Sequence, residues 1–239
     1  MIKNLRKDVQ AMANPQKAKL LQGFFKTGSG QYGEGDIFLG LTVPQSRSIA
    51  IKFKHLPYSE ITELLKSKNH EERLIALLIL VHNYKSGNEK EQKKIYNFYL
   101  KHLPYINNWD LVDLSAHSIV GAWLMDKDRK LLLKLASSKN LWSRRISVIA
   151  TFHFIKYERS SVWSFKIAEM LLNDKHDLIH KAVGWMLREI GKNISQKEEE
   201  IFLKKHYKQM PRTMLRYAIE RFDPALRKAY MTNKIEIND

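Results

Sequence analysis

The sequence contains no cysteine and little of the two residues that most often interrupt regular structure. Among its 239 residues, 10 are glycine and 6 are proline. Without cysteine, the chain forms no disulfide, no zinc–thiolate site and no thiolate nucleophile, and nothing indicates an oxidising compartment. The scarcity of glycine and proline favours long stretches of regular secondary structure.

Long apolar runs are also missing. The longest uninterrupted aliphatic run, LIALLILV, covers only Leu74 to Val81, whereas a membrane-spanning helix needs about 20 apolar residues. The first 21 residues, MIKNLRKDVQAMANPQKAKLL, include six charged side chains and do not resemble a signal peptide. We therefore expect a cytoplasmic protein.

Acidic residues are few relative to basic ones. The chain has 41 Lys and Arg against 25 Asp and Glu, a formal net charge of +16. Such an excess favours an anionic partner, with nucleic acid first and an anionic membrane surface second. A surface that is merely soluble is the simpler alternative, but the size of the excess argues against it.

Apolar residues recur at helical spacing along most of the chain. Segments such as EERLIALLILVHNY and HKAVGWMLREI show this period, and sustained apolar/polar alternation is scarce. Capping patterns support helix starts at NEKE, from Asn88 to Glu91, and at SQKE, from Ser195 to Glu198. Pro211 suits a first helical turn. The sequence predicts an all-α protein.

Five segments repeat at a regular spacing. They are EERLIAL, LVDLSAH, SRRISVI, IHKAVGW and MLRYAIE, and their aligned centres lie 40, 32, 36 and 35 residues apart. An amphipathic segment precedes each one, so the unit is a helix pair of the HEAT or armadillo kind. The length allows one large domain or two small ones, but no linker-like stretch separates the repeats. We predict one domain over 1–239, a curved solenoid of HEAT-like antiparallel helix pairs over 59–239, with 1–58 as atypical capping helices and a loop.

One position of the repeat is basic in every repeat but one. It holds, in order, Arg73, Asp113, Arg145, Lys181 and Arg216. A row of cations on stacked helices suits a phosphate backbone. Alternatively, these cations pair with acidic neighbours and stabilise the solenoid. The residues alone leave both interpretations open.

Asp113 is the exception in this column. A carboxylate among cations repels the phosphates that the cations attract, unless it meets a positive charge on the ligand. Nucleic acid carries such a charge when a purine is alkylated at N3 or N7, and again when a glycosidic bond breaks and the sugar becomes oxocarbenium-like. Asp113 is therefore a candidate for stabilising a cation.

Two tryptophans accompany this column. Trp109 precedes Asp113 by four residues, so a continuous helix places them on one face, and Trp185 follows Lys181 by four residues. An indole face attracts a cation by about 0.5–2 kcal/mol, although core packing is the common alternative for a tryptophan. We expect Asp110 to cap the start of the helix that carries Asp113.

Two weaker motifs carry no functional prediction. GSGQYG, from Gly28 to Gly33, matches a dinucleotide-binding fingerprint, but no apolar strand precedes it, so we interpret it as a flexible loop. His176 and His180 have the spacing of a zinc-binding helix, but HDLIH lacks the accompanying glutamate and a third ligand. We expect no metal and no cofactor.

The motifs NNWDLVD, LWSRR and HKAVGWMLRE together resemble the AlkD family of bacterial alkylpurine DNA glycosylases, which are built from HEAT-like repeats. The resemblance runs from about Phe38 to Phe222. It implies that Asp113 is the catalytic carboxylate and that Trp109 and Trp185 are the active-site tryptophans. It also implies that Arg145 holds a phosphate near the lesion.

The segment FLGLTVPQSR is similar to the family's N-terminal DNA-contacting loop and helix start, which makes Arg47 a candidate phosphate contact. With Arg145 and Arg47, the expected DNA-binding set contains Lys181, Arg188, Arg216 and Arg73. The resemblance implies a monofunctional glycosylase of base excision repair, acting as a monomer on duplex DNA. Its substrates would be positively charged N3- or N7-alkylated purines, removed without base flipping.

Two other functions fit the charge and the repeats. A non-catalytic HEAT-like protein that binds DNA or RNA needs no chemistry, but it leaves the combination of Asp113, Trp109 and Trp185 unexplained. A protein-interaction solenoid would bind anionic proteins, and its duplex binding would be absent or insensitive to salt.

Overall fold

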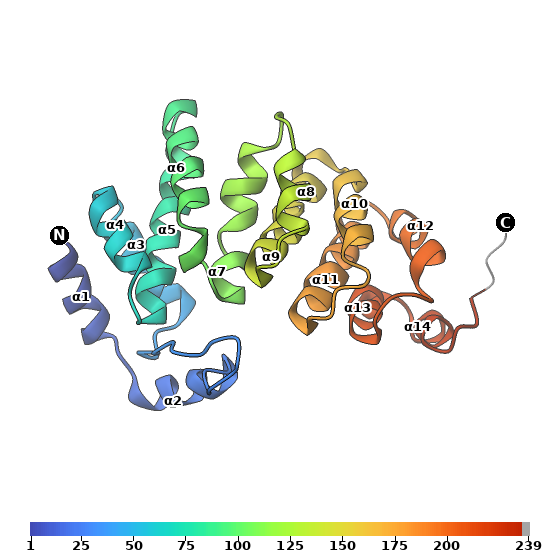
Figure 1. The fold of residues 1–239 in the computed structure, drawn as a ribbon, viewed down its shortest axis with the longest axis horizontal. Helices are drawn as coiled ribbons and strands as arrows, with labels where there is room; N and C mark the ends of the chain where they lie inside the picture. The colour runs from blue at the N-terminus through green and yellow to red at the C-terminus, as the bar shows by residue number, and fades with distance from the viewer. Residues whose placement is uncertain (236–239) are drawn as a thin grey trace. The chain divides into compact units, whose positions relative to one another are not determined.

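The computed structural model describes residues 1–235, and regular structure in this range is helical (Figure 1). One isolated β-bridge, between Ile37 and Asn69, is the only strand-like pairing in these residues. None of their helices combines the length and the apolarity needed to cross a membrane. The predicted all-α fold is confirmed. The chain divides into two compact units at Ile119 and Val120, and the single continuous domain stays a prediction.

Unit 1, Met1–Ile119, is built around α5. Its helices are α1 (Ile2–Ala11), α2 (Pro15–Phe24), α3 (Val43–Lys52), α4 (Tyr58–Leu65), α5 (His70–Ser86), α6 (Glu89–Lys101), the 3-10 helix η1 (Leu103–Tyr105) and α7 (Trp109–Asp113). Helix α5 packs against α3, α4, α6 and α7, and α2 stands apart from the other helices of the unit (Figure 1). A π-helix, η2 (His117–Gly121), follows α7 at the unit boundary.

The burial of α5 follows from its sequence. Residues 74 to 81 are all apolar, so the helix has no polar side to turn toward water in this stretch. Thirteen of its 17 residues are buried. The polar first turn, from His70 to Arg73, is buried as well, and such groups need partners inside the protein.

Unit 2, from Val120 onward, is centred on α11. Its helices are α8 (Lys130–Ala136), α9 (Leu141–Ala150), the π-helix η3 (Phe154–Glu158), α10 (Val162–Met170), α11 (Asp177–Asn193), α12 (Gln196–His206), α13 (Arg212–Ala218), the 3-10 helix η4 (Ile219–Arg221) and α14 (Pro224–Met231). Helix α11 packs against α9, α10, α12 and α13. At Gly184 a Cβ would lie 2.4 Å from the Met214 carbonyl oxygen, so glycine permits the close approach of α11 and α13.

The repeat pattern matches the observed helix pairs. The five aligned segments form the second helices α5, α7, α9, α11 and α13, and the five amphipathic segments form the first helices α4, α6, α8, α10 and α12. Three helices, α1 to α3, precede the pairs. The predicted order of helix pairs is therefore confirmed.

The predicted helix starts are largely confirmed. Asn88 forms a full capping box with Glu91 at the start of α6, and the Ser195 hydroxyl accepts a hydrogen bond from the Glu198 N–H at 3.1 Å. Pro211 lies just ahead of α13 as its N-cap, with ψ at 141°. The prediction that Pro211 occupies the first turn is off by one residue, because its backbone is extended.

A buried carboxyl in unit 2 lacks the partners that its burial demands. Glu199 on α12 is 1% exposed, and its Oε1 has no hydrogen-bond partner in residues 1–235. Its Oε2 lies 2.0 Å from the place where a Cβ on Gly191 would stand. Burial, with a contribution from Glu200, raises the pKa of Glu199 to about 9 against the opposing charge of Arg188. Glu199 is therefore protonated in the folded protein at neutral pH.

Glu199→Gln should stabilise the protein at neutral and higher pH. The raised pKa means that the stability linked to the Glu199 proton is complete below pH 4.5 and is lost as the pH rises toward about 9. Glutamine has the shape of the neutral carboxyl and does not titrate. We expect the free energy of unfolding to rise by roughly 1–3 kcal/mol at pH 8, with little change at pH 4.5. Urea unfolding at both pH values measures this, and an equal effect at both would contradict it.

Candidate functional site

Trp109 and Asp113 are the first and last residues of α7. The helix is continuous between them, so they lie one turn apart, which confirms the predicted placement on one helix. Both side chains are half-buried. A carboxylate and an indole therefore lie together on one short helix of unit 1.

The predicted cap of this helix was wrong. Asn108 is the N-cap, and its Oδ1 accepts a hydrogen bond from the Trp109 N–H at 2.8 Å. Asp110 lies inside the helix and is 6% exposed. One of its oxygens accepts a hydrogen bond from the Leu111 N–H at 2.8 Å, and the other lies 2.8 Å from Nε2 of His70. Asp110 is committed to a tertiary contact that local sequence rules do not reveal.

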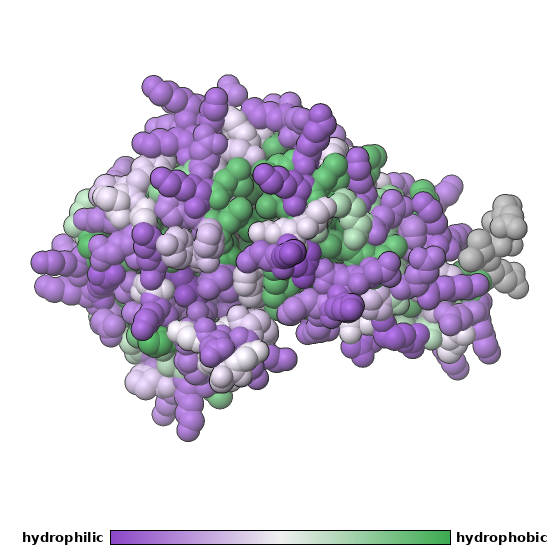
Figure 2. All heavy atoms as spheres, in the orientation of Figure 1, coloured by the Kyte–Doolittle hydropathy of each residue, from purple (hydrophilic) through white to green (hydrophobic). Residues whose placement is uncertain are grey.

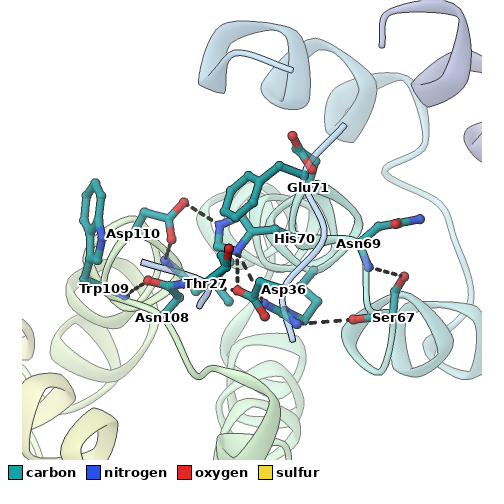
Figure 3. A network of polar contacts seen from close by, with 12 residues as sticks. Thr27, Asp36, Ser67, Asn69, His70, Glu71, Asn108, Trp109 and Asp110 are labelled. Atoms are coloured by element: carbon teal, nitrogen blue, oxygen red, sulfur yellow. Dashed lines mark hydrogen bonds and ion pairs between the residues drawn. The ribbon is translucent and has the colours of Figure 1, made fainter. Parts of the chain in front are cut away.

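His70 lies between two carboxylates in the interior of unit 1 (Figure 3). Its Nδ1 is 3.0 Å from Oδ2 of Asp36 and its Nε2 is 2.8 Å from Oδ2 of Asp110. The same Asp36 oxygen lies 2.6 Å from the Arg73 guanidinium and 3.1 Å from the Asn108 amide nitrogen. Burial alone would lower the pKa of His70, but Asp110 and Asp36 outweigh it and raise the pKa to about 9. His70 is thus a buried cation.

Trp109 is held by aromatic side chains from the end of α2. Its ring stacks on Phe25 at 4.9 Å with an interplanar angle of 7°, and Phe24 meets it edge-on at 5.9 Å. Phe24 is 65% exposed. Phe25 also lies 5.0 Å from the His70 ring. Trp109 is therefore a packed aromatic at the edge of the unit, neither fully inside the core nor free on the surface.

A cavity of about 240 Å³ opens beside this aromatic group. Residues of α2 and the following loop form most of its lining, and His70, Glu71 and Asp110 line it as well. No group of three or more His, Cys, Asp or Glu side chains in residues 1–235 could hold a metal ion.

The predicted phosphate contacts of unit 1 differ in exposure. Arg73 is 6% exposed and its guanidinium pairs with Asp36, which fits the alternative that column cations stabilise the fold. Arg47 on α3 is exposed. It lines a notch of about 80 Å³ together with His82 and Lys85 of α5. Figure 2 shows hydrophilic side chains over most of the visible face of this unit.

The predicted phosphate contacts of unit 2 also differ. Arg145 is 5% exposed and donates a hydrogen bond to the Leu178 carbonyl oxygen. Lys181 pairs with Asp177 at 2.6 Å, and Arg188 pairs with Glu220. Arg216 is exposed and makes no ion pair with another described residue. Of these four side chains, Arg216 is the most accessible to an anion.

Trp185 is half-buried on α11. Its Nε1–H donates a hydrogen bond to Oε1 of Glu189 at 3.2 Å, and the Phe152 ring lies 6.3 Å away. The hydrogen bond fixes the orientation of the indole. The catalytic role of Trp185 stays a prediction.

Sequence reasoning missed the buried network of Asp36, His70 and Asp110. One signal for it was present. The polar stretch NHEER opens a helix whose next eight residues are all apolar, and a helix that is apolar all round is buried. Its first-turn polar groups must therefore find partners inside the protein.

Comparisons with known proteins agree with this architecture. The model of a family described as DNA alkylation repair enzyme matches residues 5–222. A solved structure described as a predicted DNA alkylation repair enzyme from Enterococcus faecalis is similar in fold, with a TM-score of 0.66 and 16% identity, covering 89% of this chain and 98% of that one. No curated protein matches the chain. With its five helix pairs and a family match over most of its length, the chain belongs to the DNA alkylation repair enzyme family.

Proposed function

We propose that the protein is a monofunctional DNA glycosylase that hydrolyses the N-glycosidic bond of positively charged N3- or N7-alkylated purines in duplex DNA. The observation that carries this proposal is the carboxylate of Asp113 one helical turn from the indole of Trp109, in a basic chain of a DNA alkylation repair family. The enzyme acts as a monomer and without base flipping, as the sequence resemblance implies.

The chemistry needs little general-acid catalysis. Departure of an N3- or N7-alkylated purine neutralises the positive charge on the base, which makes it a good leaving group. The developing charge lies on the sugar, where Asp113 stabilises it and orients the attacking water. Trp109 adds cation–π attraction. Trp185 has the same role in this proposal, on the strength of the sequence resemblance.

Base release from methylated duplex DNA tests the function. Purified protein should release 3-methyladenine or 7-methylguanine faster than the uncatalysed reaction. Normal binding of methylated duplex without release would refute the glycosylase and favour a non-catalytic nucleic-acid-binding protein. Absent or salt-insensitive duplex binding would instead favour a protein-interaction scaffold.

Exposed cations of unit 1 support binding to the phosphate backbone. Arg47 and Lys85 lie on neighbouring helices at one notch, with His82 beside them. Neither Arg47 nor Lys85 makes an ion pair with a described residue. A DNA phosphate in this notch would contact Arg47 and Lys85, which have no ion-pair partner among the described residues. Neutralising the phosphate releases the counterions bound to DNA, so binding would weaken as the salt concentration rises.

Arg47→Ala should weaken duplex binding and reduce its dependence on salt. Loss of one phosphate contact lowers the slope of log K against log salt concentration by about 0.9, and we expect roughly 3- to 10-fold weaker binding at low salt. Fluorescence anisotropy with an undamaged duplex at several salt concentrations measures both. Lys90→Ala, which removes an exposed cation from α6, is the matched control. Equal slopes for Arg47→Ala and the unmodified protein would exclude this contact.

A further inference from the structure

The interior of unit 1 contains two carboxylates that share one imidazole. Asp36, His70 and Asp110 are 5%, 1% and 6% exposed. Each ring nitrogen of His70 faces a carboxylate oxygen within 3.0 Å. A carboxylate accepts hydrogen bonds and does not donate them when ionised, so both nitrogens carry protons and His70 is an imidazolium.

The charges of this cluster cancel. Asp36 and Asp110 contribute two negative charges, and His70 and Arg73 contribute two positive charges. Nη2 of Arg73 and Nδ1 of His70 lie 3.3 Å apart, but both are donors and do not hydrogen-bond to each other. Each is instead attracted to the carboxylate of Asp36. A neutral His70 would leave a buried net charge of −1, which is costly in the interior.

Every element packed against His70 contributes to its surroundings. Asp36 comes from the loop before α3, Arg73 from α5 itself, and Asp110 from α7. The next residue, Glu71, directs its carboxylate to the backbone N–H groups of residues 39–41. The rings of Phe25 and Phe38 lie 5.0 and 4.4 Å from the imidazole and complete an apolar enclosure.

The cluster also fixes the start of α7. This helix has five residues, and isolated helices shorter than about 12–15 residues are marginal in water. Its N-cap and one residue of its first turn belong to the network, because the Asn108 amide contacts Asp36 and Asp110 contacts His70. Trp109 lies between them in the sequence, and Asp113 ends the same helix. The orientation of both side chains therefore depends on the network.

We propose that His70 is a positioning residue for the reaction, because its bridge between Asp36 and Asp110 anchors α7 and so places Trp109 and Asp113 against the substrate. The inference rests on the proposed function. His70 touches no substrate, and it acts through the helix that it anchors.

The bridge has a defined pH range. The pKa of His70 is raised from 6.5 to about 9, so the stability linked to its proton is complete below pH 6.5 and is lost as the pH rises through about 9. Loss of the proton removes one of the two hydrogen bonds and leaves the buried cluster with a net charge of −1. Trp109 and Asp113 should then lose their fixed position.

Single-turnover base release tests the positioning role. At pH 7, and at a temperature where circular dichroism shows folded protein, His70→Gln should slow release at least about 10-fold while duplex affinity changes less than about 2-fold. The double variant His70→Gln with Asp110→Asn restores a neutral cluster and should recover part of the rate. His55→Gln, which changes an exposed histidine of the same unit, is the control and should match the unmodified protein. An unchanged rate per folded molecule in His70→Gln would show a purely structural role and overturn the proposal.

A second measurement does not depend on activity, and it follows the unmodified network because a variant serves only to assign one signal. Fluorotryptophan-labelled protein gives one ¹⁹F signal for each of its five tryptophans, and Trp109→Phe assigns the signal of Trp109. That signal should shift between pH 7 and 10 with a midpoint near 9, while the signal of Trp142 in unit 2 stays in place. A Trp109 signal that does not titrate would overturn the proposal. If the protein releases no base but the signal titrates, the glycosylase function fails and the link between His70 and Trp109 stands.

Discussion

Asp113→Asn is expected to lower base release by about 100- to 1,000-fold, the usual cost of removing a group that stabilises transition-state charge. Asparagine keeps the size of the side chain and part of its hydrogen bonding but carries no negative charge. The sugar cation would then lose its counter-charge at the point where the glycosidic bond breaks. The duplex, which is itself anionic, should bind the variant as well as or slightly better than the unmodified protein.

Single-turnover kinetics on duplex DNA with one 7-methylguanine measures this effect, and anisotropy on the same duplex measures affinity. Asp126→Asn provides the control, because Asp126 is an exposed carboxylate of unit 2 and its replacement changes the net charge equally. The control should release base at the unmodified rate. If Asp113→Asn also kept that rate, Asp113 would have no role in the chemistry and the non-catalytic interpretation would gain support.

The helix pairs were predictable because their signal is periodic and local. Each second helix repeats one apolar pattern, so alignment located α5, α7, α9, α11 and α13 without any structure. The end of α7 was not predictable in this way. The apolar pattern continues through LSAHSIVG, yet α7 stops at Asp113 and a π-helix follows at His117–Gly121. At Gly121, a Cβ would lie 2.3 Å from the Ala150 carbonyl oxygen, a tertiary constraint that periodicity does not contain.

Part of the candidate site was predictable because its signal is also local. The spacing of Trp109 and Asp113 is a local property of one helix, and the structure confirms it. The partner of Asp110 is His70, 40 residues earlier in the chain, and no local rule joins them. A capping role and a buried ion pair are both open to an aspartate near a helix start. The fold decides between them, because Asn108 already caps the helix.

Burial separates residues that the repeat alignment treats as equivalent. Arg73 and Arg216 occupy the same column, but Arg73 is buried against Asp36 and Arg216 is exposed. The difference lies in what covers each helix. Helix α5 is enclosed by its neighbours and by the loop that carries Asp36, whereas α13 leaves this position open. Alignment therefore predicts where a residue lies on its helix, and the packing of other elements determines whether an anion can reach it.

The loop that carries Asp36 is held at its end by the carboxylate of Glu71. Removing this carboxylate should lower the stability of the protein more than any other substitution proposed above. Glu71 is 2% exposed. Its Oε1 accepts hydrogen bonds from the N–H groups of Leu39, Gly40 and Leu41 at 3.0, 2.8 and 3.2 Å, and its Oε2 lies 3.0 Å from the Leu39 N–H. These residues join the Gly-rich loop to α3. Gly40 has φ at +89°, and a Cβ there would lie 2.2 Å from the Asn14 carbonyl oxygen, so the backbone has little freedom to find other partners.

Glu71→Ala should therefore lower the free energy of unfolding by about 3–5 kcal/mol, because three N–H donors, two of them in buried hydrogen bonds, lose a charged acceptor. The free energy of unfolding of Glu71→Gln should fall between those of the unmodified protein and Glu71→Ala, since an amide oxygen still accepts from two of these donors but lacks the charge. Glu63→Ala is the control, because Glu63 pairs with Arg6 at an exposed site, where the loss is expected to stay within about 1 kcal/mol. Urea unfolding followed by circular dichroism gives all three values. Equal losses for Glu71→Ala and Glu63→Ala would mean that the 39–41 backbone does not depend on Glu71, and the anchoring of the loop beside His70 would then come from its other contacts, such as the hydrogen bond from the His70 N–H to the Ile37 carbonyl oxygen.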